Sequence, residues 1–178
     1  MSIVTTTELK DFMGLSAVPT GGADALDTAE ALASSYIGAD TLAVTTGREE
    51  DITPPRDRLT LEVTLAPVVT LTSITYNSAA STVANTSIDK WILKSTDGFA
   101  SGTKFTATYD SGWSNGSMPE SIKRAVCAIA ESILKGDASG TVSESVGDYS
   151  RSVLPGEVSL VVPPIARSLL GSWRRPYL

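Results

Sequence analysis

Residues capable of acid–base and nucleophilic chemistry gather in one short stretch, SESVGDYSRSV (residues 143–153). Glu144 and Asp148 stand four residues apart as a candidate acid–base pair, and Ser145 and Ser150 are candidate nucleophiles. The composition of the stretch favours an extended backbone, which would hold the two carboxylates ~13 Å apart, beyond the ~5–9.5 Å of glycosidase pairs. No base is available to activate either serine. We therefore interpret the stretch as an extended connector and not as a catalytic loop.

The chain of 178 residues contains no histidine and one cysteine, Cys127. These counts exclude Ser-His-Asp and Cys-His catalysis, zinc sites that use histidine, four-cysteine metal sites and internal disulfide bonds. Cys127 falls at the margin of an apolar helical stripe, which indicates a packing residue. Glu49, Glu50 and Asp51 lack the ligand spacing of a calcium loop, and TGGAD (residues 20–24) lacks the lysine of a phosphate-binding loop. We expect no enzyme activity, no cofactor and no metal.

The formal net charge of −6 is unevenly distributed. Residues 1–57 carry three basic and ten acidic side chains, residues 58–163 carry eight and ten, and residues 164–178 carry three arginines and no acid. An acidic body disfavours specific binding of nucleic acid, because phosphate contacts need clustered lysine and arginine. A basic, aromatic tail suggests a segment that docks onto a protein partner. No apolar run approaches the ~20 residues that span a bilayer, so we expect no membrane partner and synthesis in a cytoplasm.

Helical periodicity marks residues 1–57, which we expect to form an N-terminal helical part. Threonines from Thr5 onward precede a short predicted helix that ends at Gly14. Between Asp24 and Ile37, apolar residues recur at three- and four-residue spacing, which predicts a longer helix. TTGREEDITPPRDR (residues 45–58) is predicted to be a polar linker.

The period then changes to two, and residues 58–113 are predicted to form an inserted β unit. In RLTLEVTL, apolar and polar residues alternate, as in a strand with one buried face. The alternation in VVTLTSITY slips at Thr72–Ser73, as a bulge would cause. The strand candidates are RLTLEVTL (58–65), VVTLTSITY (68–76), IDKWIL (88–93) and KFTATY (104–109), with turn composition at STDGFASG (95–102).

The chain returns to helical periodicity at residues 114–136, a predicted long helix with Ser117 as its N-cap. Residues 137–178 are predicted to form an extended arm and a docking segment, with a short helix that ends at Gly171. Together these patterns predict an α+β fold: a helical bundle core with an inserted small antiparallel β unit and an extended C-terminal arm. The apolar stripe of the long helix consists of Ile122, Val126, Ile129, Ala130 and Ile133.

Several short motifs follow one another in a recognisable order. They are PVVTLTSITY (67–76), TYDSGW (108–113) with MPESIKRAV (118–126), SESVGDYS (143–150) and SLLGSWRRPYL (168–178). In this order, and over most of its length, the chain resembles the head–tail connector (adaptor, or head-completion) proteins of tailed double-stranded DNA phages and of gene transfer agents.

The resemblance implies a structural protein of the virion neck. It implies a homo-oligomeric ring of twelve subunits beneath the portal vertex, which joins the capsid to a stopper or tail-completion protein. DNA would pass through the lumen without specific binding. The resemblance also implies two sets of site residues. The portal-binding set is Arg167, Trp173, Arg174, Arg175, Pro176, Tyr177 and Leu178, and the inter-subunit arm set is Glu144, Ser145, Asp148 and Tyr149.

Two other functions remain open from the residues alone. The β unit could be a glycan- or receptor-binding module of a virion or cell surface, with Trp91 and Trp113 stacking against sugars. A hydrolase could use Glu144 and Asp148, although the expected separation of their carboxylates disfavours it.

Overall fold

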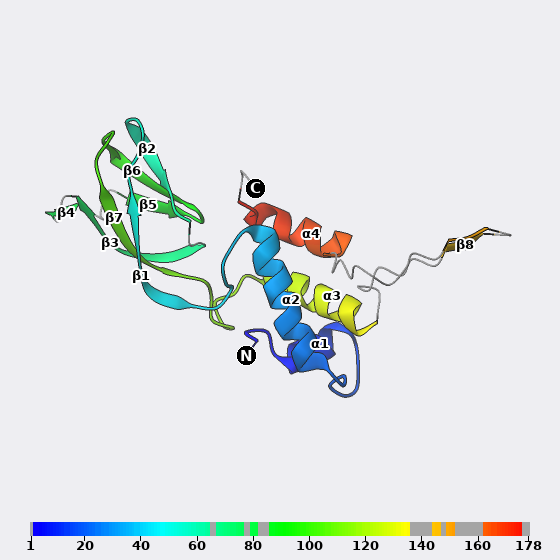
Figure 1. Ribbon diagram of the computed structural model, residues 1–178. Helices are drawn as coiled ribbons and strands as arrows, with labels where there is room; N and C mark the ends of the chain where they lie inside the picture. The colour runs from blue at the N-terminus through cyan, green and yellow to red at the C-terminus, as the bar shows by residue number, and fades with distance from the viewer. Residues whose placement is uncertain are drawn as a thin grey trace. The chain divides into compact units, whose positions relative to one another are not determined.

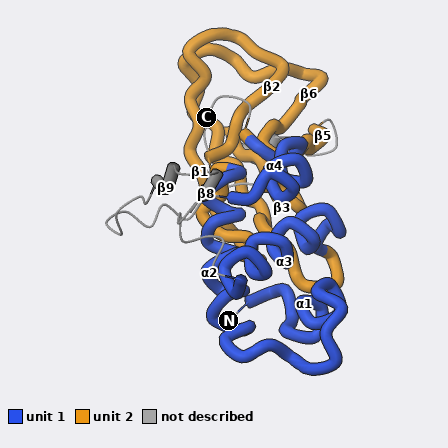
Figure 2. Tube along the Cα trace, turned by 90° about the vertical axis from the view of Figure 1, so that its right-hand side faces the viewer, with its two compact units in different colours: residues 1–37, 118–174 blue, residues 38–117, 175–178 orange. Residues whose placement is uncertain are grey.

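A computed structural model describes residues 2–64, 67–76, 79–81, 86–135, 144–146, 149–151 and 162–175. The chain divides into two compact units, one formed by residues 1–37 and 118–174 and the other by residues 38–117 and 175–178 (Figure 2). The first unit contains the long helices, and the second is built from antiparallel strands (Figure 1). The predicted α+β class is therefore confirmed.

The helical unit is centred on α3 (Glu120–Leu134), which contacts the three other α-helices. Helices α2 (Gly22–Ile37) and α4 (Pro164–Leu170) pack extensively on α3, and α1 (Thr6–Phe12) contacts both α2 and α3. A 3-10 turn, η3 (Gly171–Trp173), follows α4 directly. The predicted stripe on α3 forms the core of this unit, since every member except Ile133 is buried.

Local sequence signals fix the ends of these helices. The Thr5 side chain accepts a hydrogen bond from the Glu8 amide, and the Glu8 carboxylate accepts one from the Thr5 amide, so α1 begins with a capping box. The prediction of Ser117 as the N-cap of α3 is wrong. Pro119 holds that position, and the Ser117 hydroxyl contacts Ser114. A proline disfavours helical backbone at the residue before it, so α3 cannot begin at Ser117.

The β unit contains two antiparallel sheets, and its core lies among Leu61, Ile74, Leu93, Phe105 and Tyr109. The strand orders are β1-β7-β3-β4 and β2-β6-β5. Burial alternates strictly along β7, as its sequence predicts. The strands are β1 (Thr45–Ile52), β2 (Arg58–Glu62), β3 (Val68–Tyr76), β4 (Ala79–Ser81), β5 (Thr86–Asp89), β6 (Ile92–Phe99) and β7 (Phe105–Ser111).

The prediction of a polar linker at residues 45–58 is wrong over β1. This strand pairs with β7, with Arg48 opposite Tyr109 and Ile52 opposite Phe105. Its sequence, TTGREEDI, lacks the apolar alternation by which strands are recognised, because none of its side chains is fully buried and none has to be apolar. The β unit accordingly begins at Gly38, before the predicted start at residue 58.

Two further expectations meet different outcomes in the sheets. The predicted bulge is confirmed, because the register of β3 against β7 shifts between Leu71 and Ser73. The predicted single strand at residues 88–93 is instead the hairpin β5–β6, which turns at Lys90 with a φ of 54°. Strand β6 continues to Phe99, so the turn predicted at residues 95–102 is confined to the residues after it.

The carboxyl end of β7 is held by a close backbone contact. Ala43 and Trp113 form an isolated parallel bridge, and the Trp113 amide donates to the Leu42 carbonyl over 2.8 Å. Gly112 has a φ of +77°, and its amide donates to the Pro67 carbonyl. Only glycine fits this position, because an added Cβ would lie 2.1 Å from the Ala43 carbonyl oxygen.

Two short strands are described between α3 and α4. Strand β8 (Glu144–Val146) pairs antiparallel with β9 (Tyr149–Arg151), and Ser145 lies opposite Ser150. The extended backbone predicted for this stretch is therefore present at both strands. Among the described residues, no helix combines the length and apolar character needed to cross a bilayer.

Candidate interaction surfaces

Helix α4 presents a solvent-facing side of the helical unit and is anchored by its opposite side. Pro164 occupies the first turn, where its missing N–H costs no hydrogen bond. Ala166 and Leu170 are fully buried, and α4 packs on α3. Arg167 donates from Nε to the Val162 carbonyl over 2.7 Å, while Ile165 remains 61% exposed. The helix therefore carries an apolar and a basic side chain on a rigid support.

The residues predicted to bind a portal contact their own chain where they are described. Trp173 donates from Nε1 to the Ser121 hydroxyl of α3 over 3.2 Å. The Arg174 guanidinium lies 5.5 Å from the ring centroid of Tyr36 on α2. Such a cation–π contact at an exposed site contributes only ~0.5–1 kcal/mol, so Arg174 can exchange it for another partner.

The remainder of the predicted portal-binding set lies at or beyond the end of the described chain. Arg175 belongs to the β unit, where its guanidinium lies 5.9 Å from the Trp91 ring centroid. Pro176, Tyr177 and Leu178 lie outside the described residues. The portal-binding role of the whole set stays a prediction.

The predicted inter-subunit arm coincides with the β8–β9 pair. Glu144 and Ser145 lie on β8, and Tyr149 lies on β9. Asp148 is outside the described residues. The contribution of these four residues to contacts between subunits stays a prediction.

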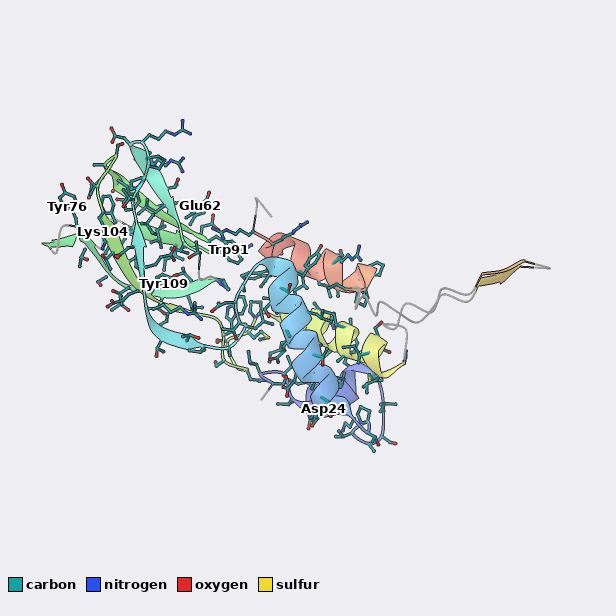
Figure 3. The ribbon with its side chains drawn as sticks, viewed as in Figure 1. Asp24, Glu62, Tyr76, Trp91, Lys104 and Tyr109 are labelled. Carbon is teal, nitrogen blue, oxygen red and sulfur yellow. The ribbon has the colours of Figure 1, made fainter. Side chains whose placement is uncertain are left out.

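The alternative in which two tryptophans stack against sugars is disfavoured by the burial of both rings. Trp91 is 4% exposed and Trp113 is 6% exposed, so neither ring face is open to a ligand (Figure 3 labels Trp91 within the β unit). The β2-β6-β5 sheet does carry a pocket of about 610 Å³. It is lined by Leu59, Thr60, Thr86, Ser87, Lys94, Ser95 and Thr96, without an aromatic ring.

Two carboxylates to which the sequence assigns no role form hydrogen bonds between distant parts of the chain. Glu30 of α2 accepts hydrogen bonds from the Ile3 and Val4 amides over 2.7 and 2.9 Å, and this ties the N-terminal segment to α2. In the β unit, Glu50 accepts hydrogen bonds from the Thr64 amide and from the buried Tyr109 hydroxyl, the latter over 2.8 Å. These pairs are separated by many residues in the chain, so no sequence motif marks them.

The charged side chains of the β unit also form local ion pairs. Asp51 lies on β1, within the segment predicted to be a polar linker. Hydrogen bonds from Lys104 and then Thr106 hold the pKa of Asp51 below its usual value. The Lys94 ammonium, 2.7 Å from Asp89, likewise lowers the pKa of that carboxyl group. Each of these carboxylates is ionised at neutral pH and is paired with a lysine.

No metal or nucleophile centre is evident in the described part of the chain. It contains no group of three or more histidine, cysteine, aspartate or glutamate residues that could hold a metal ion. Cys127 is buried in α3, and this burial raises the pKa of its thiol to about 12. The thiol is neutral at physiological pH and serves as the packing residue that the sequence predicts.

The fold of the whole chain is similar to that of a chain in a solved structure. It superimposes with a TM-score of 0.50 on a chain from the neck of an empty gene transfer agent (GTA) particle, computed with C6 symmetry. The alignment covers all of this chain and 95% of that chain, at 13% sequence identity. A chain from the neck of a native GTA particle, computed with C12 symmetry, gives a TM-score of 0.49 at 14% identity, with 100% and 94% coverage. No protein-family model and no curated protein sequence matches the chain. The likeness to the neck chain of the empty GTA particle confirms the resemblance to head–tail connector proteins at the level of the fold.

Proposed function

We propose that this protein is a structural head–tail connector of the neck of a tailed phage or gene transfer agent. In this role it forms a homo-oligomeric ring beneath the portal vertex and joins the capsid to a stopper or tail-completion protein. The observation that carries the proposal is the fold likeness to a GTA neck chain, because it extends over the full length of both units. The role is structural and involves no turnover of a substrate.

The charge of the chain suits a ring through which DNA passes. Exposed carboxylates occur in both units, with Asp24 and Asp27 on α2 and Glu49, Asp57 and Glu62 in the β unit. Acidic groups that face a channel repel phosphate and let a duplex slide without binding. The proposed ring contains twelve subunits, as the resemblance to head–tail connector proteins implies.

The C-terminal residues are the proposed portal-docking segment. Arg174 and Arg175 would exchange their present aromatic contacts for acidic groups of the portal, and Tyr177 would supply an apolar anchor. Arginine, tryptophan and tyrosine are the residue types that contribute most to interface energies.

Co-sedimentation with the cognate portal ring tests the proposal. The intact chain should sediment with the portal, and a chain that ends at Arg174 should not. A longer truncation at Pro164 is unsuitable, because it removes the buried Ala166 and Leu170 and uncovers the core face of α3. Arg175→Ala should weaken binding, whereas the control Arg124→Ala, which alters an exposed arginine of α3, should not.

The outcomes separate the assignment from its residues. If the truncated chain binds as well as the intact chain, the connector role stands and the C-terminal segment is not the anchor. If the intact chain does not bind the portal, the proposed function is wrong.

A further inference from the structure

The helical unit has two different exposed ends. Helix α1 lies at one end and α4 at the other, with α2 and α3 between them, as both views show (Figures 1 and 2). The helix contacts agree, because α1 and α4 each pack on α2 and α3. Each end combines exposed apolar side chains with charge, and the sign of the charge differs.

The α1 end is apolar and acidic. Three large apolar side chains within seven residues are exposed, Phe12 to 39%, Leu15 to 41% and Val18 to 49%. Asp11, which is 66% exposed and paired with Lys10, and the exposed Asp24 in the first turn of α2 accompany them (Figure 3 labels Asp24). Residues 8–27 hold four acidic side chains and one basic one, and Lys123 of α3 pairs with Glu8 over 2.9 Å, so this end keeps a net negative charge.

The loop that carries these apolar residues has a defined backbone. The Leu15 amide donates to the Lys10 carbonyl over 3.0 Å, and the Gly22 amide donates to the Pro19 carbonyl over 3.0 Å. The loop is therefore fixed at the end of α1 and at the start of α2. Exposed apolar side chains on a held loop lose little conformational freedom when a partner covers them.

The α4 end is apolar and basic. Ile165 is 61% exposed, Arg167 and Ser168 of the same helix are exposed, and so is Arg174 after η3. Arg167 uses its Nε–H group to donate a hydrogen bond to the Val162 carbonyl. Residues 162–175 hold three arginines and no acidic side chain.

We propose that the α1 end of one copy of this chain binds the α4 end of the next copy. Ile165 would pack among Phe12, Leu15 and Val18, and Arg167 would face Asp24. Like charges disfavour a contact between two α1 ends or between two α4 ends, so the contact is head-to-tail. Repeated head-to-tail contacts close a ring when the rotation between neighbouring subunits divides a full turn. This inference rests on the proposed ring and names the surfaces that build it.

Cross-linking of paired cysteines tests the contact in the full chain. Leu15→Cys and Ser168→Cys alter one exposed position at each end, and the native Cys127 is buried. With a short bismaleimide, the chain that carries both cysteines should give a ladder of multimers. Each single-cysteine chain should remain largely monomeric. A control pair, Ser35→Cys with Arg124→Cys on other exposed sites, should give no ladder.

Charge reversal provides an independent measurement. Arg167→Glu should weaken self-association about fivefold at low salt, with a smaller effect at high salt. Addition of Asp24→Arg to the same chain should restore association, whereas Arg124→Glu on α3 should change nothing.

Three results would overturn the proposed contact. The first is that electron microscopy shows a ring, with or without the portal, but the double-cysteine chain gives no ladder of multimers. The protein would then form a ring through surfaces other than the α1 and α4 ends. Another is a strong dimer from either single-cysteine chain, which would mean a two-fold contact. The third is a chain that neither forms a ring nor cross-links in the presence of the portal, and this result would also refute the proposed function.

Discussion

Replacement of Gly112 by alanine should destabilise the β unit far more than the same change at another glycine of similar conformation. Gly112 has a φ of +77°, and an alanine in this region costs about 1–2 kcal/mol from backbone strain alone. The new Cβ would also lie 2.1 Å from the Ala43 carbonyl oxygen and 2.8 Å from that of Leu42. These are backbone atoms, so the segment at Leu42 and Ala43 must move away from the segment at Gly112 and Trp113.

The separation removes a specific hydrogen bond. The Trp113 amide donates to the Leu42 carbonyl over 2.8 Å, and Trp113 is 6% exposed, so an unpaired amide there costs about 1–3 kcal/mol. The sum for Gly112→Ala is about 2–5 kcal/mol, a large part of the ~5–15 kcal/mol that stabilises a typical domain. Gly47→Ala is the matched control, because Gly47 has a φ of +64° and no heavy atom within 4 Å of a built Cβ. It should lose only the ~1–2 kcal/mol of backbone strain.

Urea unfolding followed by tryptophan fluorescence measures both variants. Trp91 and Trp113 report on the β unit, and a Trp173→Phe background removes the signal of the helical unit. If Gly112→Ala and Gly47→Ala shift the unfolding midpoint equally, the close approach to Ala43 contributes nothing and the reasoning is refuted.

Three further predictions concern buried or bonded polar groups. Tyr109→Phe removes a 2.8 Å hydrogen bond to the Glu50 carboxylate and should cost about 1.5–3 kcal/mol in the same urea assay; an unchanged midpoint would mean that the bond adds no net stability. Glu30→Gln weakens the acceptor of the Ile3 and Val4 amides, so amide hydrogen exchange at Val4 should accelerate while exchange in the core of α3 stays unchanged. Burial raises the pKa of Cys127 from 9.0 to about 12, so a thiol reagent should react at pH 8 only after unfolding. Because this folded-state pKa is the higher one, the stability linked to Cys127 should be complete below pH 9 and decline as the pH rises towards 12, a decline that Cys127→Ala should abolish.

Elements whose signals are local could be predicted from the sequence. The threonine N-cap of α1, the apolar stripe of α3 and the alternation of β7 each lie within one short segment, and each is predicted by it. The bulge in β3 was also predicted, because a slip in alternation of apolar residues is visible along the strand itself. The burial of Cys127 follows from its place on the α3 stripe.

The alternation of apolar residues gives a wrong prediction of burial where no other layer covers the strand. Leu59 continues the apolar alternation of β2 yet is 64% exposed, because alternation gives the face of a strand and not whether another layer covers that end. Trp91 and Trp113 were weighed as binding residues, and their burial depends on strands from elsewhere in the β unit.

By itself, the sequence determined the α+β class, the long helices, most strands and the contrast between an acidic body and a basic end. The tertiary structure decided which polar segments became ordered and which surfaces remained uncovered. Strand β1 can form although its residues are polar, because backbone pairing to β7, some sixty residues away, holds it. Across the same pair of strands, the Glu50 carboxylate accepts a hydrogen bond from the Tyr109 hydroxyl. The two exposed ends of the helical unit likewise exist only once α1 and α4 have packed on opposite ends of α2 and α3. Exposure is a property of the packed chain, since a residue's neighbours in space, and not in sequence, decide whether water reaches it.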